Sequence, residues 1–258
     1  MTNIRSGKVY DAEQYAQNYV SGYGFERYMT RARQNCCLRF IESSRPRTVL
    51  EVGCGPELLF GRTGDAGGAL ETWVTVEPSQ TYGQHAAEAF ADDRRFSLVP
   101  GYLEEAVEEL RRHAPDGFDA VLLSGLVHET TEPEKLLLAA RELLADHGVA
   151  LVIVPNEQSM HRLLAVEMNL VKSAGEITKR NVELGQRIVY SPETLKDLLV
   201  RCGYVPVGFE GYMTKFLTND QMQKVVELFG EAIVDGLEAL GRRFPENAAE
   251  FGWIVRKA

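Results

Sequence analysis

The sequence predicts an α/β protein whose core is a doubly wound, mostly parallel sheet of seven strands with helices on both sides. The first observation behind this prediction is that short runs, apolar on both faces, alternate with longer runs of helical period. The second is that proline, serine and glycine mark the ends of several helical runs. Alternation of strands and helices in this order gives a parallel sheet flanked by helices.

Seven runs have the length and composition of strands, and a parallel strand between two helical layers must be apolar on both faces. They span residues 48–52, 72–76, 96–99, 118–124, 149–154, 204–212 and 252–257. The first run enters a glycine turn, "GCG", and we expect a helix directly after that turn.

The helical runs lie between these strands, and several carry recognisable end signals. They cover residues 30–43, 103–112, 132–144, 191–203 and 219–240. Pro133 suits a helix start, and Gly148 suits a left-handed residue after the same helix. Ser191 is expected as an N-cap, with Gly203 after the helix end. These signals favour well-defined helices between the strands.

Two segments depart from the strand–helix alternation. Residues 1–45 are rich in tyrosine and are expected to form an N-terminal helical lid or cap, with the catalytic domain over 46–258. Residues 157–190 form a mostly helical insertion after the fifth strand. An insertion at that position either shapes a substrate pocket or serves as a packing element.

Composition excludes several classes of protein. The chain has 258 residues and a net charge of −9, which argues against general affinity for nucleic acid or for an anionic membrane. Its four cysteines form no C-x-x-C or zinc spacing, and no carboxylate cluster indicates a metal. The N-terminus lacks an apolar signal region and no run is long enough for a membrane span. We therefore expect a soluble, cytoplasmic protein without a metal.

The glycine turn limits the kind of ligand that could bind beside it. A phosphate-binding P-loop needs Gly-Lys-Ser/Thr after the turn, and none is present. A dinucleotide site needs a third glycine where this chain has Leu58. Glu51 and Glu57 would also repel a pyrophosphate. A cofactor with a positive centre and no phosphate fits these residues better.

The run "VLEVGCGPE" resembles the first motif of class I S-adenosylmethionine-dependent methyltransferases, E/D-x-G-x-G-x-G, with Glu57 in place of the last glycine. The resemblance continues in order through "TVEPS", "VPGYLEEA", "FDAVLLSGLVHE" and "HGVALVIVPN". It covers residues 47–156 and, more loosely, "YSPETLKDLLVRCGY". The resemblance implies a Rossmann-like fold and S-adenosylmethionine as cofactor.

The resemblance also implies roles for individual residues. Glu51 would orient the amino group of the cofactor, and Glu77 would hold both ribose hydroxyls. The other residues expected to contact the cofactor are Gly53, Cys54, Gly55, Pro78, Ser79, Tyr102, Leu103, Ser124, Gly125 and Leu126. Cys54 is expected to be a small spacer, because nothing basic adjoins it in sequence.

Tyrosine rings attract cations, and the sulfonium of the cofactor is one. We expect Tyr10, Tyr15 or Tyr19 to close over it as part of the lid, with Arg27 or Arg31 pairing with the cofactor carboxylate. The alternative is that the tyrosines pack a short helix onto the sheet.

His128 is the expected general base, because neutral imidazole is available near pH 7. It could instead cap the next helix or pack against the cofactor. Glu129 is expected as a helix-start carboxylate, whereas His161 could face the acceptor or lie in solvent.

The predicted activity is methyl transfer to a small molecule, most simply O-methylation of a natural-product or sugar intermediate of secondary metabolism. The run "SGLV" stands where methyltransferases of base or glutamine nitrogens carry N/D-P-P-Y/F, which argues against those targets. One alternative is an enzyme that cleaves the same cofactor intramolecularly and releases 5′-methylthioadenosine instead of S-adenosylhomocysteine. Another is a non-catalytic binding module. We expect no nucleic-acid or membrane partner, and a monomer or a homodimer.

Overall fold

The computed structural model describes residues 24–64, 69–183 and 185–258. Within them the strands form one seven-stranded sheet of order β3-β2-β1-β4-β5-β7-β6. The strands are β1 (Thr48–Val52), β2 (Thr72–Glu77), β3 (Phe96–Pro100), β4 (Phe118–Ser124), β5 (Leu144–Pro155), β6 (Tyr204–Tyr212) and β7 (Glu250–Lys257). The pairs from β3 to β5 are parallel, and β7 runs antiparallel to both β5 and β6. The predicted doubly wound, mostly parallel sheet is confirmed.

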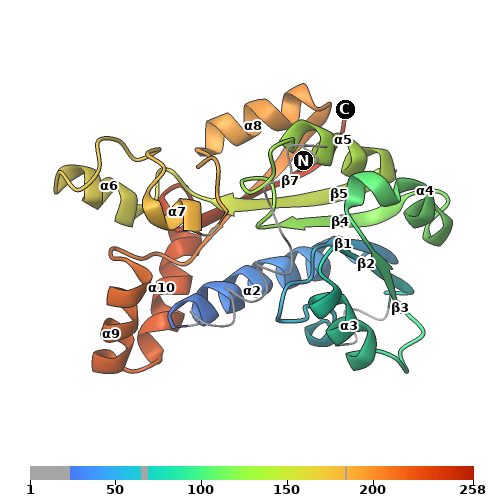
Figure 1. Ribbon diagram of the computed structural model, residues 1–258, viewed down its shortest axis with the longest axis horizontal. Helices are drawn as coiled ribbons and strands as arrows, with labels where there is room; N and C mark the ends of the chain where they lie inside the picture. Colours follow the sequence, from blue (N-terminus) through green and yellow to red (C-terminus); the bar gives the residue numbers. More distant parts are fainter. Residues whose placement is uncertain (1–23, 65–68, 184) are drawn as a thin grey trace, which may run out of the picture.

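Helices cover both faces of the sheet, as Figure 1 shows. One face is covered by α4 (Leu103–His113), α5 (Pro133–Leu143) and α8 (Pro192–Arg201), whose apolar residues join one buried cluster. The other is covered by α2 (Glu26–Ser44), α9 (Asn219–Phe229) and α10 (Ala232–Arg243), which contribute to a second cluster. The remaining helices are α3 (Gln80–Ala89), α6 (Met160–Glu167) and α7 (Lys179–Glu183).

The strand order places a reversal between β1 and β4, since β2 and β3 lie on one side of β1 and β5 lies beyond β4. Ligands of doubly wound sheets bind beyond the carboxyl ends of the strands at such a reversal. The glycine turn after β1 and the loop after β4 both leave the sheet at this edge.

The helix expected directly after the glycine turn is not formed. The chain makes only a short 3₁₀ turn, η1 (Phe60–Arg62), before Gly64, whose φ of 54° lies in the left-handed region. Phe60 is buried in an aromatic cluster, with its ring centroid 4.9 Å from Phe90 and 5.6 Å from Trp73. Tertiary packing of Phe60 therefore holds this segment close to the sheet.

The structure differs from two other helix predictions, in each case at a glycine. The run expected as one helix over 219–240 is two, α9 and α10, separated at Gly230 with a φ of 78°. Gly148 lies inside β5 instead of following α5. A Cβ there would lie 2.7 Å from the carbonyl oxygen of Phe118, so the close approach of β4 and β5 requires glycine. Gly203 does end α8, with a φ of 79°.

The helix expected at 30–43 begins earlier, at Glu26, and packs as a core helix against the sheet. The insertion 157–190 is less helical than expected, because only α6 and α7 form within it. Ser191 is confirmed as the N-cap of α8, in a reciprocal capping box with Thr194.

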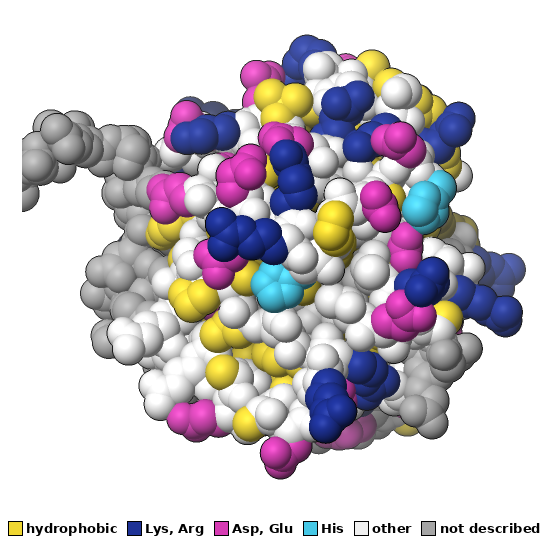
Figure 2. Space-filling view, turned by 90° about the vertical axis from the view of Figure 1, so that its right-hand side faces the viewer, with side chains coloured by type: hydrophobic (Ala, Val, Ile, Leu, Met, Phe, Trp, Pro, Cys, Tyr) yellow, Lys and Arg dark blue, Asp and Glu magenta, His cyan; other side chains and the backbone are white. Residues whose placement is uncertain are grey.

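Figure 2 shows the face on the right-hand side of Figure 1, away from the insertion. Lysine and arginine side chains alternate there with aspartate and glutamate, so the described residues on this face form no continuous basic patch. Across the helices that the structure describes, none combines the length and the apolar composition needed to cross a membrane.

Candidate active site

The glycine turn has the backbone geometry that the sequence predicts. Gly53 and Gly55 have φ values of 75° and 61°, a region that side chains with a Cβ rarely adopt. A Cβ on Gly53 would lie 3.3 Å from the side chain of Leu126, whereas one on Gly55 would meet no atom within 4 Å. The turn thus presents bare backbone to an open space at the sheet edge.

Glu77 is fixed at the end of β2 by two backbone amides. Cys54 N donates to Oε2 at 2.9 Å, and Ser79 N donates to Oε1 at 2.8 Å. The side chain is buried, and these bonds hold its carboxylate in one orientation beside the glycine turn. The structure thus links the two sequence motifs, since one carboxylate joins the turn after β1 to the turn after β2.

Glu51 lies deeper, at the side of the glycine turn facing α2. Its Oε2 accepts from Trp73 Nε1 at 3.0 Å and from Thr75 Oγ1 at 2.9 Å. Burial raises the pKa of Glu51 to about 7, although those two donors oppose the shift. Glu51 can therefore change its charge near neutral pH when a cation approaches.

A cavity of about 840 Å³ opens at this edge of the sheet, large enough for drug-sized ligands. Eleven residues predicted to contact the cofactor line it: Glu51, Gly53, Cys54, Gly55, Glu77, Pro78, Tyr102, Leu103, Ser124, Gly125 and Leu126. One cavity therefore gathers the ends of β1, β2, β3 and β4.

Two predicted contacts lie elsewhere among the described residues. Ser79 is the N-cap of α3, accepting from Tyr82 N at 3.2 Å, and it is buried outside the cavity lining. Arg31 projects toward α10 and forms an ion pair with Asp235 at 2.8 Å. Its position on α2 faces away from the cavity, so the expected pairing with the cofactor is not supported. Tyr10, Tyr15 and Tyr19 lie outside the described residues.

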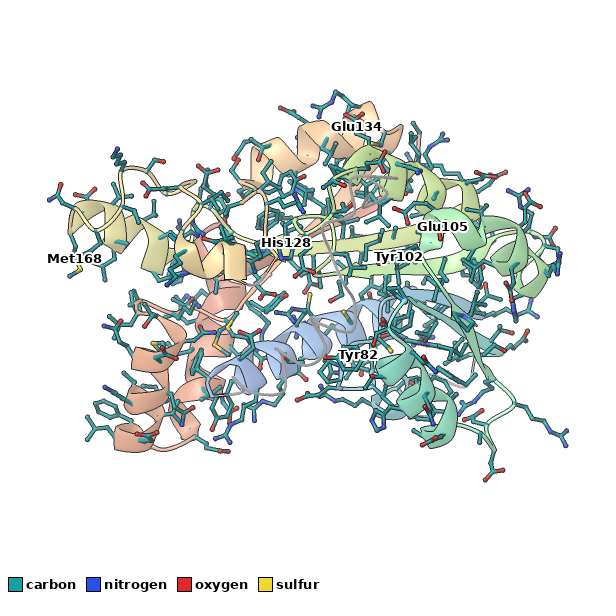
Figure 3. The ribbon with its side chains drawn as sticks, viewed as in Figure 1. Tyr82, Tyr102, Glu105, His128, Glu134 and Met168 are labelled. Atoms are coloured by element: carbon teal, nitrogen blue, oxygen red, sulfur yellow. The ribbon has the colours of Figure 1, made fainter. Side chains whose placement is uncertain are left out.

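His128 follows β4 and is buried in the wall of the cavity. Figure 3 shows it between Tyr82 and Tyr102 on one side and Met168 on the other. Burial lowers the pKa of His128 to about 3, so its imidazole is neutral at physiological pH. Its Nδ1 is buried without a hydrogen-bond partner among the described residues. A neutral ring with a free nitrogen is able to accept a hydrogen bond from a bound ligand, which is the contact that a proton-accepting group must make first.

Glu129 is not the helix-start carboxylate expected from sequence, because α5 begins at Pro133. It lines the cavity instead, with Oε1 3.5 Å from His128 Nε2. Burial raises the pKa of Glu129 to about 8, and nearby Arg33 opposes that shift. At neutral pH His128 is therefore uncharged and Glu129 is mostly protonated, so the two neighbouring side chains in this wall of the cavity are both mainly neutral.

Sequence reasoning missed a set of cavity residues on α2 and β7. Arg33 donates to Glu250 through Nε at 2.8 Å and Nη2 at 2.6 Å, and Tyr212 Oη donates to Glu250 at 2.5 Å. Glu250 keeps a lowered pKa, although burial alone would raise it, because Arg33 and Tyr212 stabilise its charge. Arg33 and Glu250 are 217 positions apart in the sequence, so no local pattern could have joined them.

His161, on α6, lines the cavity, as one of its two predicted alternatives required. Burial lowers its pKa to about 2, with Lys215 and Arg162 acting in the same direction. It therefore stays neutral in the cavity wall.

Comparison with known proteins decides the family of this chain. The sequence profile described as "Methyltransferase domain" matches residues 25–207, which is more than half of the chain. The chain belongs to this methyltransferase family. The predicted resemblance is confirmed, and so is S-adenosylmethionine as the cofactor, which methyl transfer converts to S-adenosylhomocysteine.

One curated relative of this methyltransferase is the protein N-terminal and lysine N-methyltransferase EFM7 of Eremothecium gossypii. It is 43% identical over 93 residues, covering 34% of this chain and 33% of the relative. The chain thus matches about a third of the length of that relative.

Solved structures share the fold. The 1,6-didemethyltoxoflavin-N1-methyltransferase of Burkholderia thailandensis has a TM-score of 0.57 at 14% identity, covering 98% of this chain and 93% of that one. The mitomycin 7-O-methyltransferase MmcR has a TM-score of 0.58 at 16% identity, covering 97% and 62%.

The chemistry of the cavity suits the cofactor of the family. The bare backbone at Gly55 leaves open space where a Cβ would stand. Glu77 presents a fixed carboxylate suited to two hydroxyls, and Glu51 presents one suited to an ammonium. Burial and the neighbouring Glu77 raise the pKa of Cys54, which suits the spacer role predicted for it.

Proposed function

We propose that this methyltransferase transfers a methyl group from S-adenosylmethionine to an oxygen atom of a small molecule, such as a natural-product or sugar intermediate. The observation that carries the proposal is the neutral, buried imidazole of His128, with an unpartnered Nδ1 in the wall of the same cavity as the glycine turn. A hydroxyl acceptor must lose a proton as it is methylated, and a neutral imidazole can take it.

The cofactor supplies an electrophilic methyl group and its own leaving group, a thioether. The acceptor oxygen forms a bond to the methyl carbon as the sulfur–methyl bond breaks, and the acceptor proton moves to Nδ1 of His128. The charge is balanced, because the positive charge leaves the sulfur and appears on the imidazole. Glu129 Oε1 lies 3.5 Å from Nε2, so in its ionised form this carboxylate would stabilise a positive charge on the ring. Much of the rate would come from positioning within the cavity.

At residues 124–127 this chain has "SGLV" in place of the N/D-P-P-Y/F motif of methyltransferases that act on base or amide nitrogens. This difference supports an oxygen atom as the methyl acceptor. The relative from Eremothecium gossypii is named for methylation of protein N-termini and lysines, which makes a protein amine the second candidate acceptor. Glu26 also lines the cavity, and a carboxylate favours a cationic amine.

The test is an assay of cofactor products with defined acceptors. The purified chain is incubated with S-adenosylmethionine alone, with 4-alkylphenols, with alkylamines, and with peptides bearing free N-termini and lysines. S-adenosylhomocysteine formed only with a phenol supports the proposal. Formation with an amine or peptide but no phenol would replace oxygen by nitrogen. 5′-Methylthioadenosine without acceptor would instead identify intramolecular cleavage, and no product under any condition would identify a binding module.

His128→Ala is expected to lower kcat by about 10²- to 10⁴-fold and to leave the affinity for S-adenosylhomocysteine nearly unchanged. Retained affinity also shows that the variant is folded. The matched control is His85→Ala, an exposed residue of α3, which should leave kcat unchanged. Equal rates for wild type and His128→Ala would exclude a proton-accepting role.

A further inference from the structure

The acceptor end of the cavity lies between α6 and the segment that leads into α9. Its wall contains the side chains of Leu164, Ala165, Met168, Leu170, Val171, Phe216 and Leu217. Figure 3 places Met168 far from Tyr82 and Tyr102, with His128 between them. The cavity thus runs from the glycine turn, past His128, to an apolar end.

Helix α6 is unusual because most of its residues are apolar but none of them is buried. Five of its eight residues are apolar, in the run "MHRLLAVE", and none is buried. Helix α8, of similar length, buries Leu195, Leu198 and Leu199 against the sheet. Exposure of apolar side chains on one helix is unfavourable unless something covers them.

The insertion is held in place by polar contacts instead. The guanidinium of Arg162 donates to the carbonyls of Ala174 and Glu176 and to Oδ1 of Asn181. Asn181 is itself buried and donates to Gln186 at 2.6 Å. Arg162 and Asn181 of this segment are thus directed inward, whereas Leu164, Met168 and Leu170 line the cavity. This arrangement is the reverse of that in an ordinary surface element.

Met168 and Leu170 are 57% and 68% exposed, and Phe216 on the opposite wall is 45% exposed. All three line the cavity that also holds the residues for the cofactor. An apolar surface continuous with a reaction site is best explained by a ligand that occupies both.

We propose that the acceptor is an amphipathic molecule, with its reacting hydroxyl at His128 and an apolar body of alkyl or fused-ring character against α6 and Phe216. This inference rests on the proposed function for the position of the hydroxyl, but the apolar subsite binds by contact area alone. Each methylene moved from water into such a site adds about 0.8 kcal/mol, or close to four-fold in affinity.

The experiment uses the full chain with S-adenosylhomocysteine bound and titrates 4-methylphenol through 4-hexylphenol by calorimetry. The dissociation constant is expected to fall by about three- to four-fold per added methylene. Leu164→Asn and Met168→Asn should flatten this dependence. Both side chains are exposed, so the thermal unfolding temperature should stay near the wild-type value.

The matched control is Leu228→Asn, an exposed leucine of α9 outside the cavity lining, which should keep the wild-type dependence. In the wild type, a dissociation constant that does not change with the length of the alkyl group would overturn the inference. The same conclusion would follow if both cavity variants kept the wild-type change in dissociation constant per methylene. Self-association abolished by Leu164→Asn, without phenol binding, would show that a second copy covers this surface and would also overturn it.

The two proposals fail separately. Chain-length-dependent binding without methylation of any phenol would refute the proposed function and keep the apolar subsite. Methylation of phenols with a rate and an affinity that do not change with the length of the alkyl group would support the proposed function and refute the apolar subsite.

Discussion

At the scale of single residues, the site depends on groups whose burial changes their charge. His128 is neutral because burial lowers its pKa, and Glu51 and Glu129 have raised pKa values for the same reason. Glu51 and Glu129 can therefore exchange protons near neutral pH, whereas His128 stays neutral there. Shifted pKa values of this kind are common among groups in binding clefts.

The left-handed glycine at position 55 gives a prediction at this scale. Gly55→Ala should weaken binding of S-adenosylhomocysteine by at least about ten-fold, because its Cβ would project into the open side of the turn. It should also lower the free energy of unfolding by about 1–2 kcal/mol through backbone strain. Calorimetric titration and chemical denaturation measure the two effects.

The control is Gly64→Ala, which has a φ of 54° and open space around it but lies outside the cavity lining. It should lose similar stability and keep its affinity. Equal affinities for the two variants would show that the open side of Gly55 does not face the cofactor.

At the scale of elements, α2 is fixed to the sheet by a buried ion pair as well as by apolar packing. Arg33 and Glu250 join α2 to the start of β7, and Glu26 on α2 contacts Arg33 at 3.4 Å and Asn219 of α9 at 2.8 Å. All four residues line the cavity, so this polar network joins α2, α9 and β7 along the cavity wall.

Glu250→Ala is expected to lower the free energy of unfolding by about 3 kcal/mol, because it leaves the buried charge of Arg33 with weaker compensation. The double variant Arg33→Met/Glu250→Leu should recover most of that loss, since it removes both charges. Chemical denaturation of Arg33→Met, Glu250→Leu and the double variant completes the cycle.

The comparison variant is Glu71→Ala, which breaks the exposed Arg47–Glu71 pair. It should cost much less than Glu250→Ala, because an exposed pair is screened by water. Similar losses for Glu71→Ala and Glu250→Ala would show that the buried pair is not needed to hold α2.

At the scale of the whole molecule, the free energy of unfolding should decrease both at low pH and at high pH. His128 binds a proton less readily in the folded state, so its contribution falls as pH decreases from about 6.5 toward 3. Glu129 binds a proton more readily in the folded state, so its contribution falls as pH rises from about 4.5 to 8. The two ranges overlap from pH 4.5 to 6.5, where the opposite effects of His128 and Glu129 offset each other. The protein without cofactor should therefore be most stable in this mildly acidic interval.

Glu129→Gln tests the alkaline side, because an amide cannot ionise. The variant should gain stability relative to wild type as pH rises from 4.5 to 8, by at most about 1.4 kcal/mol per pH unit. Urea denaturation at several pH values measures the difference. Glu88→Gln, at an exposed position of α3, serves as the control and should follow the wild-type curve. A constant difference between Glu129→Gln and wild type across this range would contradict the raised pKa.

Local sequence determined the strands, the glycine turn and most of the cavity residues that are expected to contact the cofactor. Strand period, turn glycines and the acidic residues at the ends of β1 and β2 are properties of short segments. The position of Glu51, Gly53, Gly55 and Glu77 at one sheet edge was therefore predictable. Helix ends such as Ser191 were predictable for the same reason.

Only the tertiary structure decided the acceptor side of the cavity. Whether Glu129 faces a helix start or a cavity, and whether Arg31 or Arg33 of α2 lines the site, depends on packing between segments far apart in the chain. Burial by those segments also sets the charge of His128 and leaves the apolar side chains of α6 uncovered. Periodicity reports the face that a residue occupies on its own element, but desolvation depends on what the rest of the chain places against that face.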